Sequence, residues 1–301
     1  MTAGIMSSQE ALQQLINALS LGSTYALLAL GLAMVFSILG LVNFAHGELV
    51  TVAAYTIYIE NEHGVPFAIQ VVSAVVAASI AAVLMERIAF RPLRGASFVT
   101  LLFSSFALSV IIQNLFLAFV SPRQKGVAMP NVFNTAFRFG GTYSIGWLPV
   151  ITTITCLLSL VVLTLFLRRS VQGLGMLAAS QDFQVTRLMG ISANRVIMAA
   201  FAISGALAGV AAIFILARRG TVEPTMGFNP VLKAFIASVI GGLGSLSGAV
   251  VGGFVLAFIE VTLDATLPVD IAPFRDAFAL LIVIAILYFR PEGLLTRSEE
   301  R

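Results

Sequence analysis

Charged side chains are scarce in this sequence. Only 10% of its 301 residues are Asp, Glu, Lys or Arg, and 59% are hydrophobic, whereas soluble domains average about 25% charged residues. The mean hydropathy is +1.01. This composition argues against a soluble protein. The few Arg and Lys residues lie at the ends of apolar runs, which is the usual orientation signal of membrane proteins, so we expect lipid contact and no nucleic-acid partner.

Cysteine and the common catalytic motifs are also lacking. Cys156 is the only cysteine, so neither an intrachain disulfide nor a thiolate metal site can form. Neither of the two lysines, Lys125 and Lys233, follows the glycines of an ATP-binding P-loop. The two histidines are far apart in sequence, and no protease, hydrolase or dinucleotide motif has a fitting context. We therefore expect no catalytic, cofactor or metal site, and transport becomes the default function.

Long apolar runs are abundant instead. Runs of roughly 20 residues can cross a ~30 Å hydrocarbon core as helices. The 32-residue run from about 230 to 262 is too long for one crossing, and its glycine-rich centre, 241–248, is where we expect a break or bend. The N-terminus lacks a basic region and a cleavage site, so the first helix should be retained. The sequence predicts an all-α polytopic inner-membrane bundle, one domain over 1–301, with about eight or nine transmembrane or re-entrant segments.

The longest polar interruption spans residues 168–195 and sets the orientation. It holds four Arg, the loop 87–97 holds three and the tail holds three, against six Lys or Arg in the opposite loops at 121–146, 218–230 and 263–275. Positive residues favour the cytoplasm. The interruption, the loop 87–97 and the C-terminus are therefore predicted to be cytoplasmic.

Three polar residues interrupt the first apolar region, namely Asn43, His46 and Glu48. Ionisable groups at membrane depth are costly, about 2.5–3.5 kcal/mol on insertion scales, and so indicate a cavity or translocation path. The alternative is structural. Asn43 would be a good N-cap for the next helix, and Glu48 in its first turn would suit the positive end of the helix dipole.

Glycines at helical spacing indicate close packing of helices. Gly244, Gly248 and Gly252 fall four residues apart, and Gly205 with Gly209 repeats the interval. Such stripes allow helix backbones to approach, either within this subunit or at a subunit interface. Glu260 and Asp264, one turn apart near the outer end of the same run, are expected to mark a solvated helix end.

The interruption itself suggests a short helix. Ser180, Gln184 and Arg187 could share one face, with Ala178, Val185 and Met189 opposite, and Gly190 would end it. A solvated linker would explain the charges. The apolar residues instead suggest a helix that docks into a partner's groove.

Four stretches together resemble a known family. They are Leu39–Glu48 (LGLVNFAHGE), Ala178–Asp182 through Gly190–Ile191, Pro224–Gly227 through Gly241–Ala249, and Arg290–Leu294 (RPEGL). In order and spacing they resemble the LIV-type branched-chain amino acid ABC transporter permeases, specifically the smaller of the two permease subunits. The resemblance covers nearly the whole chain.

That resemblance implies an import subunit of the bacterial inner membrane, not an enzyme. Its partners would be a second permease subunit, two ABC ATPase subunits that hydrolyse the ATP, and a periplasmic solute-binding protein. The 168–195 loop is similar in role to the coupling loop of bacterial importers, although it lacks the leading Glu of their consensus and has Asp182 instead. The implied ATPase contacts are Ala178, Ala179, Asp182, Arg187, Gly190 and Ile191.

Three other functions stay open at this stage. Urea or short-chain amides could be the cargo of such a permease. An ion-coupled secondary transporter would need a coupling site within this chain, for which His46 and Glu48 are the candidates. A receptor or structural role is weakened by the absence of a sizeable soluble segment.

Overall fold

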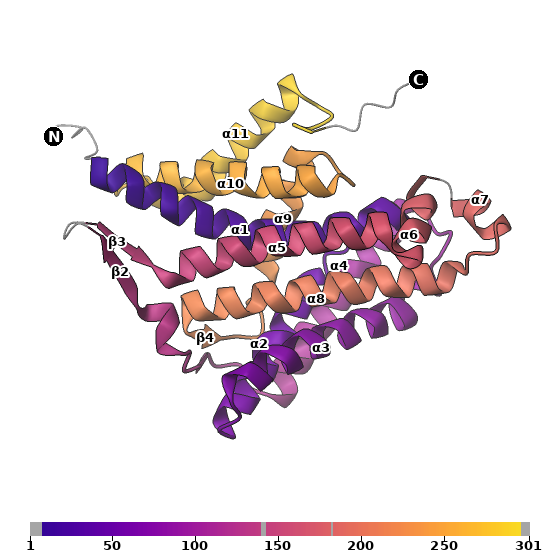
Figure 1. Ribbon diagram of the computed structural model, residues 1–301, viewed down its shortest axis with the longest axis horizontal. Helices are drawn as coiled ribbons and strands as arrows, with labels where there is room; N and C mark the ends of the chain where they lie inside the picture. The colour runs from indigo at the N-terminus through magenta and orange to yellow at the C-terminus, as the bar shows by residue number, and fades with distance from the viewer. Residues whose placement is uncertain (1–7, 140–142, 182, 296–301) are drawn as a thin grey trace.

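The computed structural model describes residues 8–139, 143–181 and 183–295, and most of them are helical (Figure 1). The helices are α1 (Ser8–Leu39), α2 (His46–Glu62), α3 (Phe67–Met85), α4 (Phe98–Phe119), α5 (Trp147–Arg169), α6 (Val171–Gln181), α7 (Phe183–Leu188), α8 (Ala193–Arg219), α9 (Phe228–Gly241), α10 (Leu246–Thr266) and α11 (Arg275–Phe289). Seven of them, α1, α3, α4, α5, α8, α10 and α11, are long and apolar enough to cross a membrane. With the shorter α2 and α9, they confirm the predicted polytopic helical fold.

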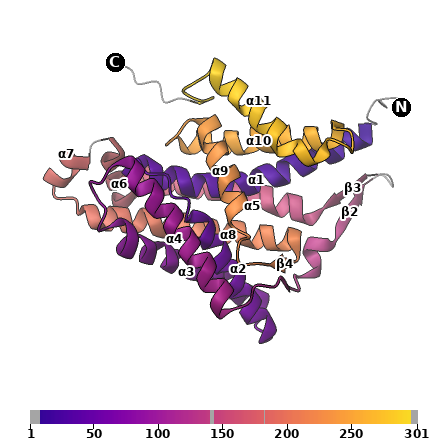
Figure 2. The same cartoon turned by 180° about the vertical axis from the view of Figure 1, so that it is seen from behind.

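The long helices run side by side, so the molecule has two ends (Figures 1 and 2). One end carries α6 and α7, and there the loop after α3 contacts the start of α8 through a hydrogen bond from Arg94 to Asn194. We call it the cytoplasmic end, following the distribution of positive charge. The opposite, outer end carries the short strands β1 (Lys125–Gly126) and β4 (Thr221–Val222), which pair with each other.

The outer end is more ordered than the loop predicted over 121–146. Strands β2 (Ala136–Phe139) and β3 (Tyr143–Gly146) pair there as an antiparallel hairpin, which follows a 3₁₀ turn at Asn131–Asn134. The strands are too short for their alternation to stand out in the sequence. The N-terminal end of α1 lies beside this hairpin (Figure 1).

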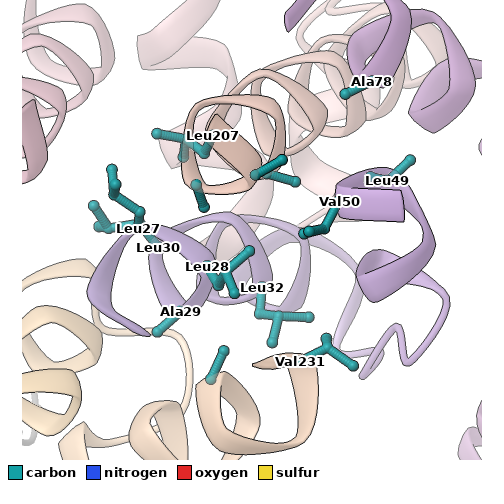
Figure 3. Packing of buried hydrophobic residues seen from close by; sticks show 14 of the residues in the cluster. Leu27, Leu28, Ala29, Leu30, Leu32, Leu49, Val50, Ala78, Leu207 and Val231 are labelled. Carbon is teal, nitrogen blue, oxygen red and sulfur yellow. The ribbon is translucent and has the colours of Figure 1, made fainter. Parts of the chain in front are cut away.

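Helices α1 and α8 form the centre of the bundle. Figure 3 shows Leu28 and Leu30 of α1 packed among Leu207 of α8, Val50 of α2 and Val231 of α9. In the most apolar 18-residue stretch of α1, 83% of the residues are buried. One helix near the N-terminus therefore organises elements from the whole length of the chain.

Glycines allow two of the closest helix contacts. A Cβ added at Gly205 of α8 would lie 2.5 Å from the carbonyl oxygen of Ala78 in α3, and one at Gly209 would lie 2.9 Å from the Cα of Val75. A Cβ at Gly252 of α10 would lie 1.9 Å from a carbonyl oxygen of α9. All of these contacts lie within the subunit.

The run 230–262 breaks at its glycine-rich centre. Helix α9 ends at Gly241, and α10 begins after Ser245, whose hydroxyl accepts from the backbone N–H of Gly248 at 3.0 Å. Gly248 also packs against Gly241. Gly244, however, lies in the turn with φ +85°. The expectation that Gly244 starts a helical packing stripe is therefore wrong, because it is a turn glycine that needs the left-handed region.

The predicted break between the first two helices is also present. Helix α1 ends at Leu39, and Gly40 has φ +63° with its N–H donating to the carbonyl of Phe36 at 2.8 Å. Helix α2 begins at His46 after the N-cap residue Ala45, which makes no side-chain cap. The prediction of Asn43 as N-cap is thus wrong. Asn43 lies too far upstream, and only its backbone carbonyl accepts from the His46 N–H, at 3.2 Å.

Candidate functional site

Helices α2 and α9 begin against each other inside the bundle. A Cβ added at Gly227, which precedes α9, would lie 1.8 Å from the carbonyl oxygen of Gly47, so the two backbones touch. Helix α2 has 17 residues and α9 has 14, about 26 and 21 Å of helix at 1.5 Å per residue. Both are short for a ~30 Å core. Discontinuous helices of this kind, with N-terminal dipole ends inside the membrane, recur at the binding sites of transporters.

Glu48 is fully buried in the first turn of α2. Its Oε1 accepts hydrogen bonds from the Ser109 hydroxyl and the Gln113 amide of α4, both at 2.7 Å. Within the described part of the chain, its Oε2 has no hydrogen-bond partner. The carboxylate therefore joins α2 to α4, a helix whose most apolar stretch is only 11% buried.

His46 contacts a different pair of helices. Its Nδ1 lies 3.2 Å from the hydroxyl of Ser204 in α8, and that hydroxyl donates to the carbonyl of Gly31 in α1 at 2.9 Å. His46 and Asn43 are both buried, and the His46 Nε2 and Asn43 Oδ1 have no partner among the described residues. The structure thus directs His46 and Glu48 toward different helices and does not bring them to one shared site.

An ion-pair network in the outer half was not predicted. The Lys233 ammonium of α9 lies 2.9 Å from Glu260 Oε1 of α10 and 3.3 Å from Asp276 of α11. The Tyr25 hydroxyl of α1 donates to Glu260 Oε2 at 2.9 Å. The expectation that Glu260 is solvated is therefore wrong, since this carboxylate is buried between four helices, whereas Asp264 is exposed and pairs with Arg275. In the sequence, the position of Lys233 within an apolar run indicates that a buried acidic partner is present.

The C-terminal motif holds the cytoplasmic end of α9. The backbone N–H of Leu294 donates to the carbonyl of Ile240 at 2.8 Å, and that of Leu295 donates to Gly241 at 3.2 Å. A Cβ at Gly293 would lie 2.5 Å from the N of Gly242. The four stretches that suggested a family thus include two pairs that touch, 39–48 with 224–227 and 241–249 with 290–294.

The interruption 168–195 is helical on both sides of Asp182, with α6 ending at Gln181 and α7 starting at Phe183. The predicted face shared by Ser180 and Arg187 passes through Asp182, so it stays a prediction. Asp182 lies outside the described residues, and of Arg187 only the backbone, in α7, is described. Gly190, with φ +81°, follows the end of α7 as predicted.

The predicted contact residues in this segment divide between two surfaces. Ala179 is buried against the bundle, and Ile191 is half-buried beneath Gly175, while Ala178 is half-buried. Leu188, which is 86% exposed, and Met189, which is 78% exposed, present apolar side chains at the end of α7, and Val171, which is 88% exposed, does so at the start of α6. Sequence reasoning placed Met189 on the apolar face and missed Leu188. A free apolar surface therefore exists at the end of α7.

Comparison with known proteins decides the family. Residues 14–287 match the family described as the branched-chain amino acid transport system permease component. The chain belongs to this family. It is 36% identical to the high-affinity branched-chain amino acid transport system permease protein BraD of Pseudomonas aeruginosa, with 96% of each chain covered. It is 33% identical to the permease protein LivH of Escherichia coli, again over 96% of each.

Permeases whose names give a different solute match a smaller part of this chain. The ribose import permease protein RbsC of Haemophilus influenzae is 31% identical over 110 residues, which are 34% of this chain and 33% of that relative. No solved structure matches the chain. Family membership and the seven spans together make this protein a multi-pass transport permease of the inner membrane.

Proposed function

We propose that this chain is one permease subunit of an ABC importer for branched-chain or related amino acids, with residues 1–301 working as one membrane domain. The observation that carries the proposal is the 36% identity, over nearly the full length of both chains, to a permease of a high-affinity branched-chain amino acid system. Its partners are a second permease subunit, two ATPase subunits that hydrolyse the ATP, and a periplasmic binding protein that delivers the solute.

The translocation path in this proposal passes the start of α2 and α9. Asn43, His46 and Glu48 surround that start, and each keeps a buried polar atom without a partner among the described residues. Such atoms cost free energy unless another state of the protein or a ligand satisfies them. All three side chains are buried, so access requires α9 to move relative to α2, as alternating access would provide.

Substitution separates this path role from a packing role. Asn43→Ser and His46→Gln keep a polar group at each position, and we expect them to lower solute uptake at least fivefold while the complex still assembles. Uptake measured in vesicles, together with copurification of the partner subunits, gives both readouts. Failure to assemble, or normal uptake, would speak for packing alone.

In this proposal an ATPase subunit contacts the permease at the exposed end of α7. Leu188 and Met189 present apolar side chains at the cytoplasmic end, and a short helix with such residues suits a groove on an ATPase subunit. Helix α6 rests on the bundle, where a Cβ at Gly173 would lie 2.2 Å from the carbonyl oxygen of Phe166 in α5. A displacement of α7 by an ATPase subunit is thereby transmitted through α6 to α5, which α6 contacts at Gly173.

The coupling role is tested with the double variant Leu188→Asp/Met189→Asp. We expect the ATPase subunits to copurify at least tenfold less, because two charges would enter an apolar contact. Val269→Asp is the matched control, since Val269 is equally exposed but lies at the outer end. Unchanged copurification and unchanged solute-stimulated ATP hydrolysis in the double variant would rule out this surface.

The cargo is tested by uptake into proteoliposomes that contain the whole complex and its binding protein. Labelled leucine, isoleucine and valine should be imported with ATP, and urea and short-chain amides should not. Import of urea or an amide in place of the amino acids would replace the proposed cargo. Import driven by an ion gradient without ATP would replace the proposed mechanism.

A further inference from the structure

A cavity lies at the cytoplasmic end of the chain, away from the contact between α2 and α9. Its volume is about 250 Å³, just below the ~300–1,000 Å³ of pockets that hold drug-sized ligands. Its walls come from the end of α1, the turn after α3 and the starts of α4 and α8. The apolar lining residues are Ile38, Leu39, Leu41, Phe90, Leu101 and Ile197. Such walls suit a small molecule with an aliphatic side chain.

Two opposite charges share this cavity. Glu86 is 1% exposed, and its Oε1 accepts from the guanidinium of Arg94, which is 27% exposed and lies at the mouth beside Gly95. Glu86 Oε2 is buried and has no hydrogen-bond partner in the described structure. A buried carboxylate oxygen without a partner favours the binding of a hydrogen-bond donor, because the missing hydrogen bond costs about 1–3 kcal/mol or more.

The backbone at Glu86 is unusual as well. Residues Glu86–Phe90 form a π-helical turn at the end of α3, with the N–H of Arg91 donating to the carbonyl of Glu86 at 2.7 Å. Both end residues of the turn, Glu86 and Phe90, line the cavity. Single π turns are rare and occur frequently at functional sites. The turn, the unsatisfied oxygen and the cavity are three separate observations on the same few residues.

We propose that this cavity binds a free aliphatic α-amino acid from the cytoplasmic side. The α-ammonium group donates to Glu86, the α-carboxylate accepts from Arg94, and the side chain lies among the apolar walls. The inference rests on the proposed function, because the imported cargo is the amino acid that accumulates at this face. A neutral solute such as urea carries no charge to pair with either group.

Occupancy has a consequence for transport. The end of α1, the start of α4 and the start of α8 meet at the cavity, and these helices must shift relative to one another when the bundle changes state. A ligand that binds this arrangement better than the other stabilises it. The amino acid that has been imported therefore slows further import.

Binding is measured on the complete transporter in nanodiscs, without binding protein and without ATP. Labelled leucine should bind saturably. Leucinamide, which lacks the carboxylate, and 4-methylpentanoate, which lacks the ammonium group, should compete at least tenfold less well. Glu86→Gln, which keeps the shape of the side chain, and Leu101→Trp, which fills the cavity and leaves both charges, should each weaken leucine binding at least tenfold.

The control replaces a different ion pair. Arg219 and Glu223 lie 3.3 Å apart on the surface at the outer end, and Arg219→Gln/Glu223→Gln should leave leucine binding unchanged. Leu101 is only partly buried, so Leu101→Trp decides the question if Glu86→Gln does not assemble. In proteoliposomes, leucine on the cytoplasmic side should slow import by the native complex at least threefold and should not slow import by Leu101→Trp.

The outcomes distinguish this inference from the proposed function. If the native complex imports leucine but binds none without its binding protein, or if both variants bind it normally, the cavity is not an amino acid site and only the inference falls. If the complex imports urea or an amide and no amino acid, the proposed function falls first and this inference falls with it.

Discussion

Helices α1 and α4 have the same mean hydropathy and opposite surroundings. In the most apolar stretch of α1, 83% of the residues are buried inside the chain, and in that of α4 only 11% are. Helix α11 resembles α4 in both respects. Hydropathy therefore identifies the segments that enter the membrane without telling which of them contact lipid or a partner and which form the core. In the bilayer both environments are apolar, so no hydrophobic penalty separates them.

Close packing and polar contacts make the difference. Helix α1 is surrounded by neighbours that approach through small residues, such as Gly253 of α10, whose added Cβ would lie 2.7 Å from the N of Ala26. Helix α4 buries only Ser105 and Ser109 completely, and both hydroxyls bond to the α2 region. The central helices are held by backbone proximity, whereas α4 is attached by a few hydrogen bonds and by stacking of Phe106 on Phe44 and of Phe116 on Tyr55. Four predictions test this contrast.

The largest effect is expected from Gly227→Val. A side chain there would collide with the backbone of Gly47, which cannot rotate away, so α9 could not dock against α2. We expect no assembled complex in detergent extracts, measured by size-exclusion chromatography. Gly126→Val is the control, because no atom lies within 4 Å of the added Cβ. A monodisperse Gly227→Val complex would show that the backbones at Gly47 and Gly227 can move apart without loss of assembly.

The next effect concerns the buried ion pair. Lys233→Met leaves the carboxylate of Glu260 buried without its cation, which should destabilise the protein by about 3–5 kcal/mol. Lys233→Met/Glu260→Gln removes both charges and should recover most of that loss. Thermal unfolding of the purified protein measures both variants. A double variant no more stable than the single one would mean that the pair itself is needed.

A matched pair of leucines compares the two kinds of helix directly. Leu28→Ala in α1 should cost about 2–5 kcal/mol, because it leaves a cavity in the core. Leu115→Ala in α4 should change stability by about 0.5 kcal/mol or less, since this side chain is half-exposed on the surface of the chain. Unfolding in the same detergent decides the comparison. Equal losses would show that a partner or lipid covers α4 as tightly as the core covers α1.

A smaller effect than that of Leu28→Ala is expected from Ser109→Ala. It removes one of the two donors to Glu48 Oε1 and should cost about 1–3 kcal/mol. The neighbouring Ser104→Ala, which leaves the Glu48 contacts in place, is the control. Proteolysis of the membrane-embedded chain should show α4 released first. If the two variants behave alike, the hydrogen bond to Glu48 does not attach α4.

Much of the organisation was predictable from sequence. The breaks near residues 40–45 and 242–245 follow from glycines and polar residues inside apolar runs, and both are present in the structure. The orientation obtained by counting Arg and Lys stays a prediction. The prediction of one amphipathic helix over 178–190 stays a prediction, because Asp182 in its middle lies outside the described residues.

The candidate site was less predictable. Asn43, His46 and Glu48 are close in sequence, yet the side chains of His46 and Glu48 contact different helices, since residues two positions apart on a helix point in different directions. The position of Glu260 near the outer end of an apolar run predicts a solvated helix end, yet the carboxylate is buried. Its partner Lys233 lies on another helix, and no local pattern links the two.

The sequence by itself determined the membrane class, the spans and the helix breaks, because hydropathy and glycine content act locally along the chain, and its charges predict which face is cytoplasmic. Only the tertiary structure decided which equally apolar helices are buried, where Glu48 and Glu260 find their partners, and that residues from Ile38 to Ile197 enclose one cavity. Those features depend on contacts between residues that are distant in the chain, and the energies that select them are packing and hydrogen bonding in three dimensions.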